Sequence, residues 1–171
     1  MKLRSFLSLL ATAGILAIAP QAWAAPAPHV SISGFDALSQ PLPKPYDEAA
    51  DGARAVATAR KRALAEHKKL LIDLGGNWCA DCRILAGVIA LPEVEAFVRS
   101  HYVVVTVDIG RYDKNMQVPA GFGINHLDGV PALLIVDPKS GKLLNKDHLF
   151  ALADARHMTP QALADWLAQW V

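Results

Sequence analysis

Residues 70–83 read LLIDLGGNWCADCR and place a strand pattern, a turn and a cysteine pair in direct succession. The run at 70–74 is almost wholly apolar and ends at two glycines, which is typical of a strand buried on both faces. Apolar residues at helical spacing follow over 84–89, so a helix is expected directly after Trp78. The two cysteines of the chain therefore lie where a buried strand gives way to a helix.

The spacing of Cys79 and Cys82 suits a dithiol that cycles with a disulfide. A thiol at the start of a helix faces unpaired backbone N–H groups and the positive end of the helix dipole, and both lower its pKa. We therefore expect Cys79 to be the nucleophile, whose thiolate attacks a disulfide sulfur of a partner to form a mixed disulfide. Cys82 lies one helical turn further on and is expected to be more buried, so it would resolve that mixed disulfide.

Other interpretations of the same two cysteines stay open at this level. The spacing is also that of zinc ligands, but a structural zinc site needs two more ligands, and the histidines of the chain show no paired spacing. A copper-binding or copper-delivery module is the main alternative function, with both thiols and His126 holding copper(I), a soft ion suited to thiolates. Two inert buried cysteines are the third interpretation.

The first 24 residues carry the pattern of a secretory signal peptide. Lys2 and Arg4 form a basic start, an apolar run covers residues 6–19, and small residues follow. The apolar run is shorter than the roughly 20 residues of a membrane-spanning helix. We therefore expect cleavage after Ala24 and no membrane association of the mature chain. Export matters chemically, because outside the cytosol a cysteine pair can form and keep a disulfide.

The composition of the 171 residues fits one globular domain with extensions. Hydrophobic residues make up 53%, which excludes a disordered chain. The formal net charge is +1, from 17 basic and 16 acidic residues, so no basic excess exists to neutralise a phosphate backbone, and nucleic acid is not expected as a partner. Residues 25–45 are rich in proline and serine and are expected to form a loosely attached N-terminal arm, and residues 46–171 one domain.

Strand and helix patterns alternate along this domain. The sequence predicts helices at 47–67, after Trp78, from Pro92, briefly at 118–124, and from Pro160, with Thr159 as a good N-cap. It predicts strands at 70–74, 102–109 and 131–136, and turn residues at 137–141 indicate that 142–150 returns as an antiparallel strand. This order of elements indicates an α/β sandwich around one sheet.

Two segments of the chain resemble the thioredoxin superfamily. Residues 71–83 combine a tryptophan before the first cysteine, an acidic residue six positions before that cysteine and a basic residue after the second one. The sequence GVPA at 129–132 matches the glycine, apolar residue and proline that precede a strand in that superfamily. The likeness extends over residues 69–171. The segments at 91–94 and 103–108 resemble exported members akin to the periplasmic reducing domain of disulfide-interchange proteins.

This resemblance implies a thioredoxin-like three-layer sandwich, an α/β fold with a central mixed sheet flanked by helices. It also implies a thiol:disulfide oxidoreductase that works in the periplasm and needs neither a cofactor nor a metal. Its partners would be disulfide-containing client proteins and an upstream dithiol that serves as electron donor. A thioredoxin-shaped adaptor without redox chemistry is a competing interpretation.

The resemblance assigns roles to two residues of the first segment. Asp73 lies inside an apolar strand, so its pKa should be raised and it could take the proton of Cys82; the alternative is a strand-end carboxylate bonded to backbone. Trp78 should shield the disulfide between Cys79 and Cys82 and shape the contact surface, or else belong to the core. Both residues are thus expected to act on the cysteine pair from close by.

The second segment is expected to supply the binding surface. Pro131 should follow a cis peptide bond, which costs little before proline and would place the Val130 backbone beside the cysteines, where an extended client segment can pair with it. An ordinary trans proline at the start of a strand is the alternative. The segment 125–128 is longer than its counterpart in thioredoxin itself, and we expect it to border the active site.

The charges around the pair depart from those of thioredoxin. The buried lysine that accompanies the acidic residue there has no obvious counterpart, because residues 104–106 are Val-Val-Thr. Asp81 would place negative charge near the Cys79 thiolate and disfavour the reduced anionic form, whereas Arg83 would have the opposite effect. On balance the sequence favours a reductase over an oxidase.

Overall fold

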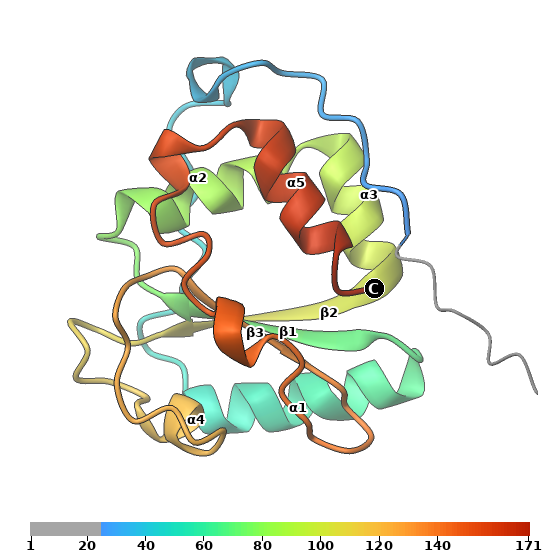
Figure 1. The fold of residues 1–171 in the computed structure, drawn as a ribbon. Helices are drawn as coiled ribbons and strands as arrows, with labels where there is room; N and C mark the ends of the chain where they lie inside the picture. Colours follow the sequence, from blue (N-terminus) through green and yellow to red (C-terminus); the bar gives the residue numbers. More distant parts are fainter. Residues whose placement is uncertain (1–24) are drawn as a thin grey trace, which may run out of the picture.

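Strand β1 (Lys69–Gly75) is the middle strand of the sheet in the computed structural model, which describes residues 25–171. It pairs in parallel with β2 (Tyr102–Asp108) and antiparallel with β3 (Ala132–Val136), in the order β2-β1-β3 (Figure 1). These are the three strands predicted with apolar runs, and their mixed sheet is confirmed. The signal peptide predicted at 1–24 lies outside the described residues.

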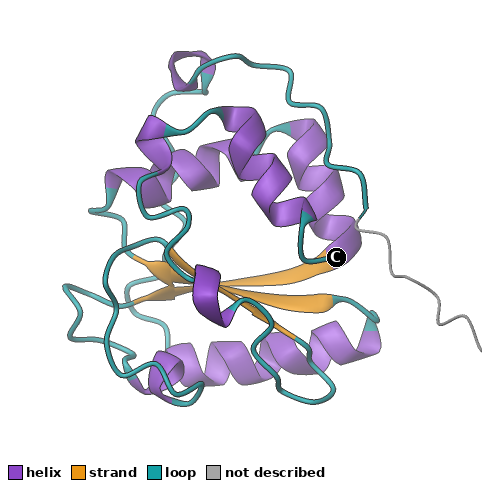
Figure 2. Ribbon diagram, viewed as in Figure 1, coloured by secondary structure: helices purple, strands orange, loops and turns teal. Residues whose placement is uncertain are grey.

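Helices cover both faces of this sheet (Figure 1, Figure 2). One face carries α2 (Ala80–Ile89), α3 (Pro92–His101) and α5 (Pro160–Ala168), which lie above the sheet in Figure 1. The other face carries α1 (Gly52–Ala65) and the short α4 (Gln117–Ala120). The structure therefore confirms the thioredoxin-like three-layer α/β sandwich. No helix within residues 25–171 is both long and apolar enough to cross a membrane.

Helix starts follow the side chains that cap them. The Asp51 side chain accepts a hydrogen bond from the Arg54 N–H at 3.1 Å and opens α1, so this helix begins later than the predicted 47–67. Thr159 accepts from the Ala162 N–H at 3.1 Å and opens α5, with a proline in the first turn as predicted. The caps satisfy backbone donors that would otherwise have no partner at these ends.

The two faces of β1 bury different side chains. Leu70, Ile72 and Leu74 pack in the core layer that contains α1, and Leu71 packs with residues of α2, α3 and α5. Burying each leucine stabilises the fold by about 2 kcal/mol. Because side chains alternate along a strand, Asp73 points to the same side as Leu71. A carboxyl group in such a core costs stability, which marks Asp73 as a candidate functional residue.

The predicted strand at 142–150 is wrong. A single β-bridge forms there, and the chain then enters the short 3-10 helix η2 (Lys146–His148). The buried side chain of Asn145 replaces part of the missing strand: its Oδ1 accepts from the Ile135 N–H and its Nδ2 donates to the Leu133 carbonyl, both at 2.8 Å. One side-chain amide thereby satisfies the backbone of the β3 edge where a strand was expected.

The N-terminal arm is also not loosely attached, contrary to the expectation from its composition. It runs over the outer side of α2, α3 and α5 (blue in Figure 1) and buries Val30 and Leu38. Arg83 of α2 donates hydrogen bonds to the carbonyl groups of Leu42 and Pro43, at 2.7 and 3.1 Å. The prolines of this segment lack an N–H donor but keep their carbonyl acceptors, so side chains of the domain can hold it.

Candidate active site around Cys79 and Cys82

Cys79 is the N-cap of α2 and is joined to Cys82 by a disulfide. Their Cα atoms lie 5.3 Å apart, and the Cys82 backbone N–H donates to the Cys79 sulfur at 3.1 Å. A backbone N–H donor and the positive end of a helix dipole at this position favour a thiolate over a thiol. This geometry makes Cys79 the better nucleophile of the two.

The two sulfurs differ in access. Cys82 is fully buried, whereas Cys79 borders a surface hollow of about 370 Å³. The hollow is lined by Trp78, Cys79, Ala80, Asp81, Tyr112, Gly129, Val130, Ala153 and Arg156. The Cys79 sulfur is therefore easier for an incoming disulfide to reach than the Cys82 sulfur.

The peptide bond between Val130 and Pro131 is cis, the geometry that the resemblance implied. The Val130 carbonyl oxygen lies 3.5 Å from the Cys79 sulfur, and Val130 lines the hollow. Backbone placed at this point can pair with an extended peptide. The segment 125–128 leads directly into Gly129 and Val130, which line the hollow, and its Leu127 packs in the same core cluster as Cys79, but none of its own residues lines the hollow.

Asp73 is almost fully buried, and burial raises the pKa of its carboxyl group to about 7. The Tyr46 hydroxyl donates a hydrogen bond to its Oδ1 at 2.8 Å, which lowers that pKa in part. The carboxyl group is thus bonded to a tyrosine side chain rather than to backbone. A group that titrates near neutral pH can accept and release a proton under physiological conditions, as a proton acceptor for Cys82 must.

Trp78 lies at the surface and not in the core. Its side chain is 41% exposed, and its Nε1 donates to the Gly110 carbonyl at 2.7 Å. The Arg111 guanidinium lies 4.3 Å from the centre of the indole ring, a distance typical of a cation–π contact. These two contacts fix the ring beside Cys79 with part of its apolar surface open to a partner.

Tyr112 is a candidate functional residue that the sequence did not indicate. Its side chain is as exposed as that of Trp78, the two ring centroids lie 6.3 Å apart, and it lines the hollow. Its backbone φ is +68°, in the left-handed region that aromatic residues rarely adopt. Strained backbone of this kind collects at binding sites. Gly110 marks a turn in the sequence, but a turn pattern does not say which side chain is presented.

Asp81 lies beside Cys79 in the hollow, as expected, but its negative charge is paired. Arg156, from the 3-10 helix η3 (Ala155–His157), donates to both carboxylate oxygens of Asp81. Burial opposes ionisation of Asp81, but the hydrogen bonds and charge of Arg156 outweigh it and lower the pKa of the carboxyl group. Sequence could not reveal this partner, because the two residues are 75 positions apart.

The placement of possible metal ligands does not support the copper alternative. Residues 25–171 contain no group of three or more His, Cys, Asp or Glu side chains that could hold a metal ion. His126, the candidate third ligand, has a side chain that is 84% exposed and lies 3.5 Å from the Asp128 carboxylate. The two sulfurs therefore have no third protein ligand beside them in this part of the chain.

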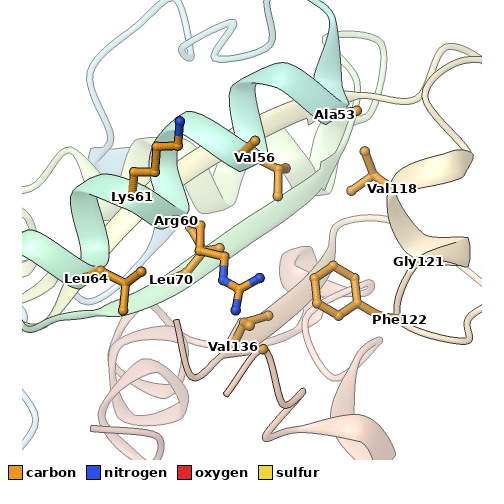
Figure 3. Close-up of a pocket in the computed structure, with 12 residues that line it drawn as sticks. Ala53, Val56, Arg60, Lys61, Leu64, Leu70, Val118, Gly121, Phe122 and Val136 are labelled. Atoms are coloured by element: carbon orange, nitrogen blue, oxygen red, sulfur yellow. The ribbon is translucent and has the colours of Figure 1, made fainter. Parts of the chain in front are cut away.

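A larger groove of about 600 Å³ lies beside α1, on the other face of the sheet (Figure 3). Apolar side chains line most of it, including Val56, Leu64 and Phe122, and α1 also contributes Arg60 and Lys61. Its lining includes neither cysteine, and it shares no residue with the hollow at Cys79. The redox site is therefore the smaller hollow, because chemistry requires the sulfur.

A buried strand that leads into a helix capped by Cys79, with a cis proline beside it, defines the thioredoxin-like class of thiol:disulfide oxidoreductases. A family model described as thioredoxin-like matches residues 50–138, just over half of the chain. The chain belongs to this thioredoxin-like family and is a thiol:disulfide oxidoreductase.

Among solved structures, a disulphide isomerase from Xylella fastidiosa Temecula1 is similar, with 34% identity and a TM-score of 0.69 over 75% of this chain and 97% of that chain. An HIV epitope-scaffold and a protein from Pseudomonas aeruginosa have 17% and 20% identity and TM-scores of 0.37 and 0.36, each over 68% of this chain and 82% of the other. Likeness at that lower level supports no conclusion here. No curated protein sequence matches the chain closely.

Proposed function

We propose that this protein is exported and reduces disulfide bonds of client proteins through Cys79 and Cys82. The Cys79 thiolate attacks one sulfur of a client disulfide, and the other client sulfur leaves as a thiolate. Asp73 then takes the proton of the Cys82 thiol, and the new thiolate attacks the Cys79 sulfur. The bond between Cys79 and the client breaks as the Cys79–Cys82 disulfide forms. The client gains the two electrons that the cysteine pair loses, and an upstream dithiol returns two electrons to the pair.

One observation supports this function most strongly: the Cys79 sulfur lies 3.1 Å from a backbone N–H at the start of α2 and 3.5 Å from the Val130 carbonyl oxygen. The N–H donor favours the thiolate that attacks. The carbonyl belongs to backbone on which an extended peptide can be seated. Nucleophile and peptide-binding backbone thus meet at one point.

The pairing of nearby cations supports the reducing direction. Arg83 is bonded to carbonyl groups of the arm, and Arg156 is bonded to Asp81. Both guanidinium groups therefore have partners of their own instead of stabilising the Cys79 thiolate. A cysteine pair whose reduced form lacks such stabilisation is the more reducing one. The reduction potential measured against glutathione should lie below about −150 mV, and a value at or above it would reverse the proposed direction.

The surface beside Cys79 suits a protein or peptide client. Trp78 and Tyr112 present two exposed rings at one side of the hollow, and Val130 presents backbone. Aromatic rings give large contact area at small entropic cost, while a backbone edge accepts any extended sequence. This combination supports clients that share an extended shape around the disulfide rather than one particular sequence.

The decisive experiment traps the mixed disulfide. Cys82→Ser removes the resolving thiol, so the variant should accumulate a stable adduct between Cys79 and a disulfide-bonded peptide, seen by mass spectrometry without reductant. Cys79→Ser is the matched control, because its remaining thiol is buried, and it should form little adduct. If Cys82→Ser forms no adduct and the wild-type protein shows no dithiol/disulfide couple, the proposed function is wrong.

Isomerisation is a second candidate activity, favoured by the similarity to the disulphide isomerase from Xylella fastidiosa. Both activities begin with the same attack by Cys79, but in isomerisation a client thiol displaces Cys79 before Cys82 does. Catalytic amounts of reduced protein should be mixed with a scrambled client without any dithiol donor. Recovery of native pairing over many turnovers indicates an isomerase, whereas one oxidation of the cysteine pair per molecule indicates a reductase.

A further inference from the structure

The junction between the N-terminal arm and the domain, at Pro45 and Tyr46, is held by two side chains of the active-site region. The Tyr46 N–H donates to the Asn77 Oδ1 at 3.2 Å, and the Asn77 Nδ2 donates back to the Tyr46 carbonyl at 2.8 Å. Thr106 of β2, which lies opposite Asp73 in the β1–β2 register, donates to the Pro45 carbonyl at 2.9 Å. Asn77 is two residues before Cys79. The backbone of Tyr46 is thus fixed relative to both the cysteine loop and the central strand.

The Tyr46 side chain enters the core between Asp73 and Cys82. It is almost fully buried, and its hydroxyl donates to Asp73 Oδ1 at 2.8 Å. A Cβ atom built on Gly75 would lie 2.8 Å from the Cys82 sulfur and closer still to the Tyr46 hydroxyl oxygen. The hydroxyl and the sulfur therefore border the same small space, which is open because residue 75 has no side chain. Tyr46, Asp73 and Cys82 form one buried cluster.

We propose that Tyr46 is a positioning residue of this active site, whose hydroxyl orients the Asp73 carboxyl group and sets the pH at which it takes the Cys82 proton. This inference rests on the proposed function for the role of Asp73. With one carboxylate oxygen held by Tyr46, the other is left to accept the proton of the Cys82 thiol as that sulfur attacks the mixed disulfide. Tyr46 directly follows the arm and thereby contributes to the site, although it lies outside the segment that resembles thioredoxin.

Tyr46 acts as a hydrogen-bond donor and not as the proton acceptor. Burial, followed by the charge of Asp73, raises the pKa of Tyr46 far above its usual range, so the phenol keeps its proton at physiological pH. A donor to the carboxylate stabilises its ionised form and so works against burial, which raises the pKa of Asp73. The sequence shows no buried lysine to accompany Asp73. Tyr46 instead supplies a hydrogen bond to the Asp73 carboxyl group, without a positive charge.

Few other ionisable groups face this cluster among the described residues. Cys79 and Cys82 come from the α2 side, and the β3 residue opposite Asp73 is the apolar Leu133. Asp108, at the end of β2, contributes to the raised pKa of Tyr46, and its carboxylate lies 3.4 Å from Lys114. A change in the titration of Asp73 on removal of the Tyr46 hydroxyl can therefore be assigned to the lost hydrogen bond.

Tyr46→Phe tests the proposal, because it keeps the ring and removes only the hydroxyl. The carboxyl carbon of Asp73 should be titrated by NMR in the oxidised protein, where the cysteines do not titrate. Loss of the donor should raise the pKa of Asp73 by about one unit. In acid-quenched single turnovers with a peptide disulfide, mixed disulfide should accumulate transiently. In Tyr46→Phe, the pH above which Cys82 rapidly resolves this mixed disulfide should rise by about one unit as well.

Tyr102→Phe is the matched control. Tyr102 is equally buried, but its hydroxyl donates to the Leu167 carbonyl at 2.7 Å, in the other core cluster. This variant also loses one tyrosine hydrogen bond, yet it should leave the titration of Asp73 and the resolution step unchanged. In an Asp73→Asn background, Tyr46→Phe should have no further effect on resolution, because the two residues act through one carboxyl group.

The possible outcomes separate this inference from the proposed function. A folded Tyr46→Phe protein whose Asp73 titration and resolution rate equal those of the wild type overturns the role of Tyr46 while the redox function stands. Equal effects of Tyr46→Phe and Tyr102→Phe on resolution would reduce Tyr46 to a structural residue. A wild-type protein that does not react with peptide disulfides overturns the proposed function, and the NMR titration still decides whether Tyr46 controls Asp73.

Discussion

The Arg156 side chain donates to both carboxylate oxygens of Asp81, and its backbone N–H donates to Oδ1 of the same group at 2.9 Å. The pair ties the first turn of α2 to η3, and both residues line the hollow at Cys79. Asp81 is almost fully buried, while the Arg156 side chain is half exposed. The net charge next to Cys79 is therefore set by a residue far away in the sequence.

Loss of Arg156 and loss of Asp81 should shift the reduction potential of the Cys79–Cys82 disulfide in opposite directions. Arg156→Ala leaves the Asp81 carboxylate unpaired, which disfavours a thiolate on Cys79 and makes the pair more reducing by about 10–30 mV. Asp81→Asn leaves the guanidinium unpaired and should shift the potential upward by a similar amount. Equilibration with glutathione measures both values. Arg62→Ala, which removes an exposed ion pair on α1, is the control and should not change the potential. Shifts of the same sign in both active-site variants would contradict this account.

Asp73→Asn should stabilise the oxidised protein at pH 8 but not at pH 4. Burial raises the pKa of Asp73 to about 7 in the folded protein, against 3.8 without the fold. Between about pH 4 and pH 7 this carboxyl group is ionised in the unfolded chain but protonated in the folded protein. The stability contributed by Asp73 is therefore full below about pH 4 and is lost as the pH rises through about 7. The difference between the two pKa values of Asp73 corresponds to a loss of stability of about 4 kcal/mol at most. Asparagine does not ionise and avoids this loss.

Urea unfolding at pH 4, 6 and 8 measures this effect. The advantage of Asp73→Asn should grow across the series and reach about 2–4 kcal/mol at pH 8. The surface variant Asp165→Asn serves as control and should show no such growth. An advantage that is constant with pH would mean that ionisation of Asp73 is not its cause.

Trp78→Ala and Tyr112→Ala should each weaken the reduction of a protein client without affecting the reduction of a small disulfide reagent. Both rings border the hollow but neither takes part in the exchange between sulfurs. Loss of one aromatic contact should lower kcat/KM for the protein client about tenfold, mainly through KM. Leu64→Ala removes a similarly exposed apolar side chain on α1 and should leave kcat/KM unchanged. Equal losses with both substrates would place the rings in the chemical step instead.

Sequence patterns predicted those parts of the structure that depend on local spacing. The strand at 70–74 and the helix after Trp78 follow from apolar periodicity, and the N-cap position of Cys79 follows from their junction. The partners of the buried carboxylates could not be predicted in this way. Asp73 is bonded to a residue 27 positions away and Asp81 to one 75 positions away, and no local pattern records such distances.

The failed prediction at 142–150 has the same physical origin. Turn residues at 137–141 correctly indicated that the chain reverses, but they say nothing of which group then bonds the β3 edge. Asn145 does so through its side chain, and a side chain that imitates a peptide group leaves the backbone free to form η2. An asparagine in a polar stretch looks like a loop residue, so its burial could not be foreseen.

Asn145→Ala should therefore destabilise the fold far more than a surface asparagine does. The substitution leaves the Ile135 N–H and the Leu133 carbonyl buried without partners, and each unsatisfied group costs about 1–3 kcal/mol. Urea unfolding of the oxidised protein should show a loss of about 2–6 kcal/mol, whereas the exposed Asn125→Ala should change stability little. The reduction potential should not move, because the altered hydrogen bonds lie on the side of β3 away from β1. A loss as small as that of Asn125→Ala would mean that water, and not Asn145, satisfies this edge of the sheet.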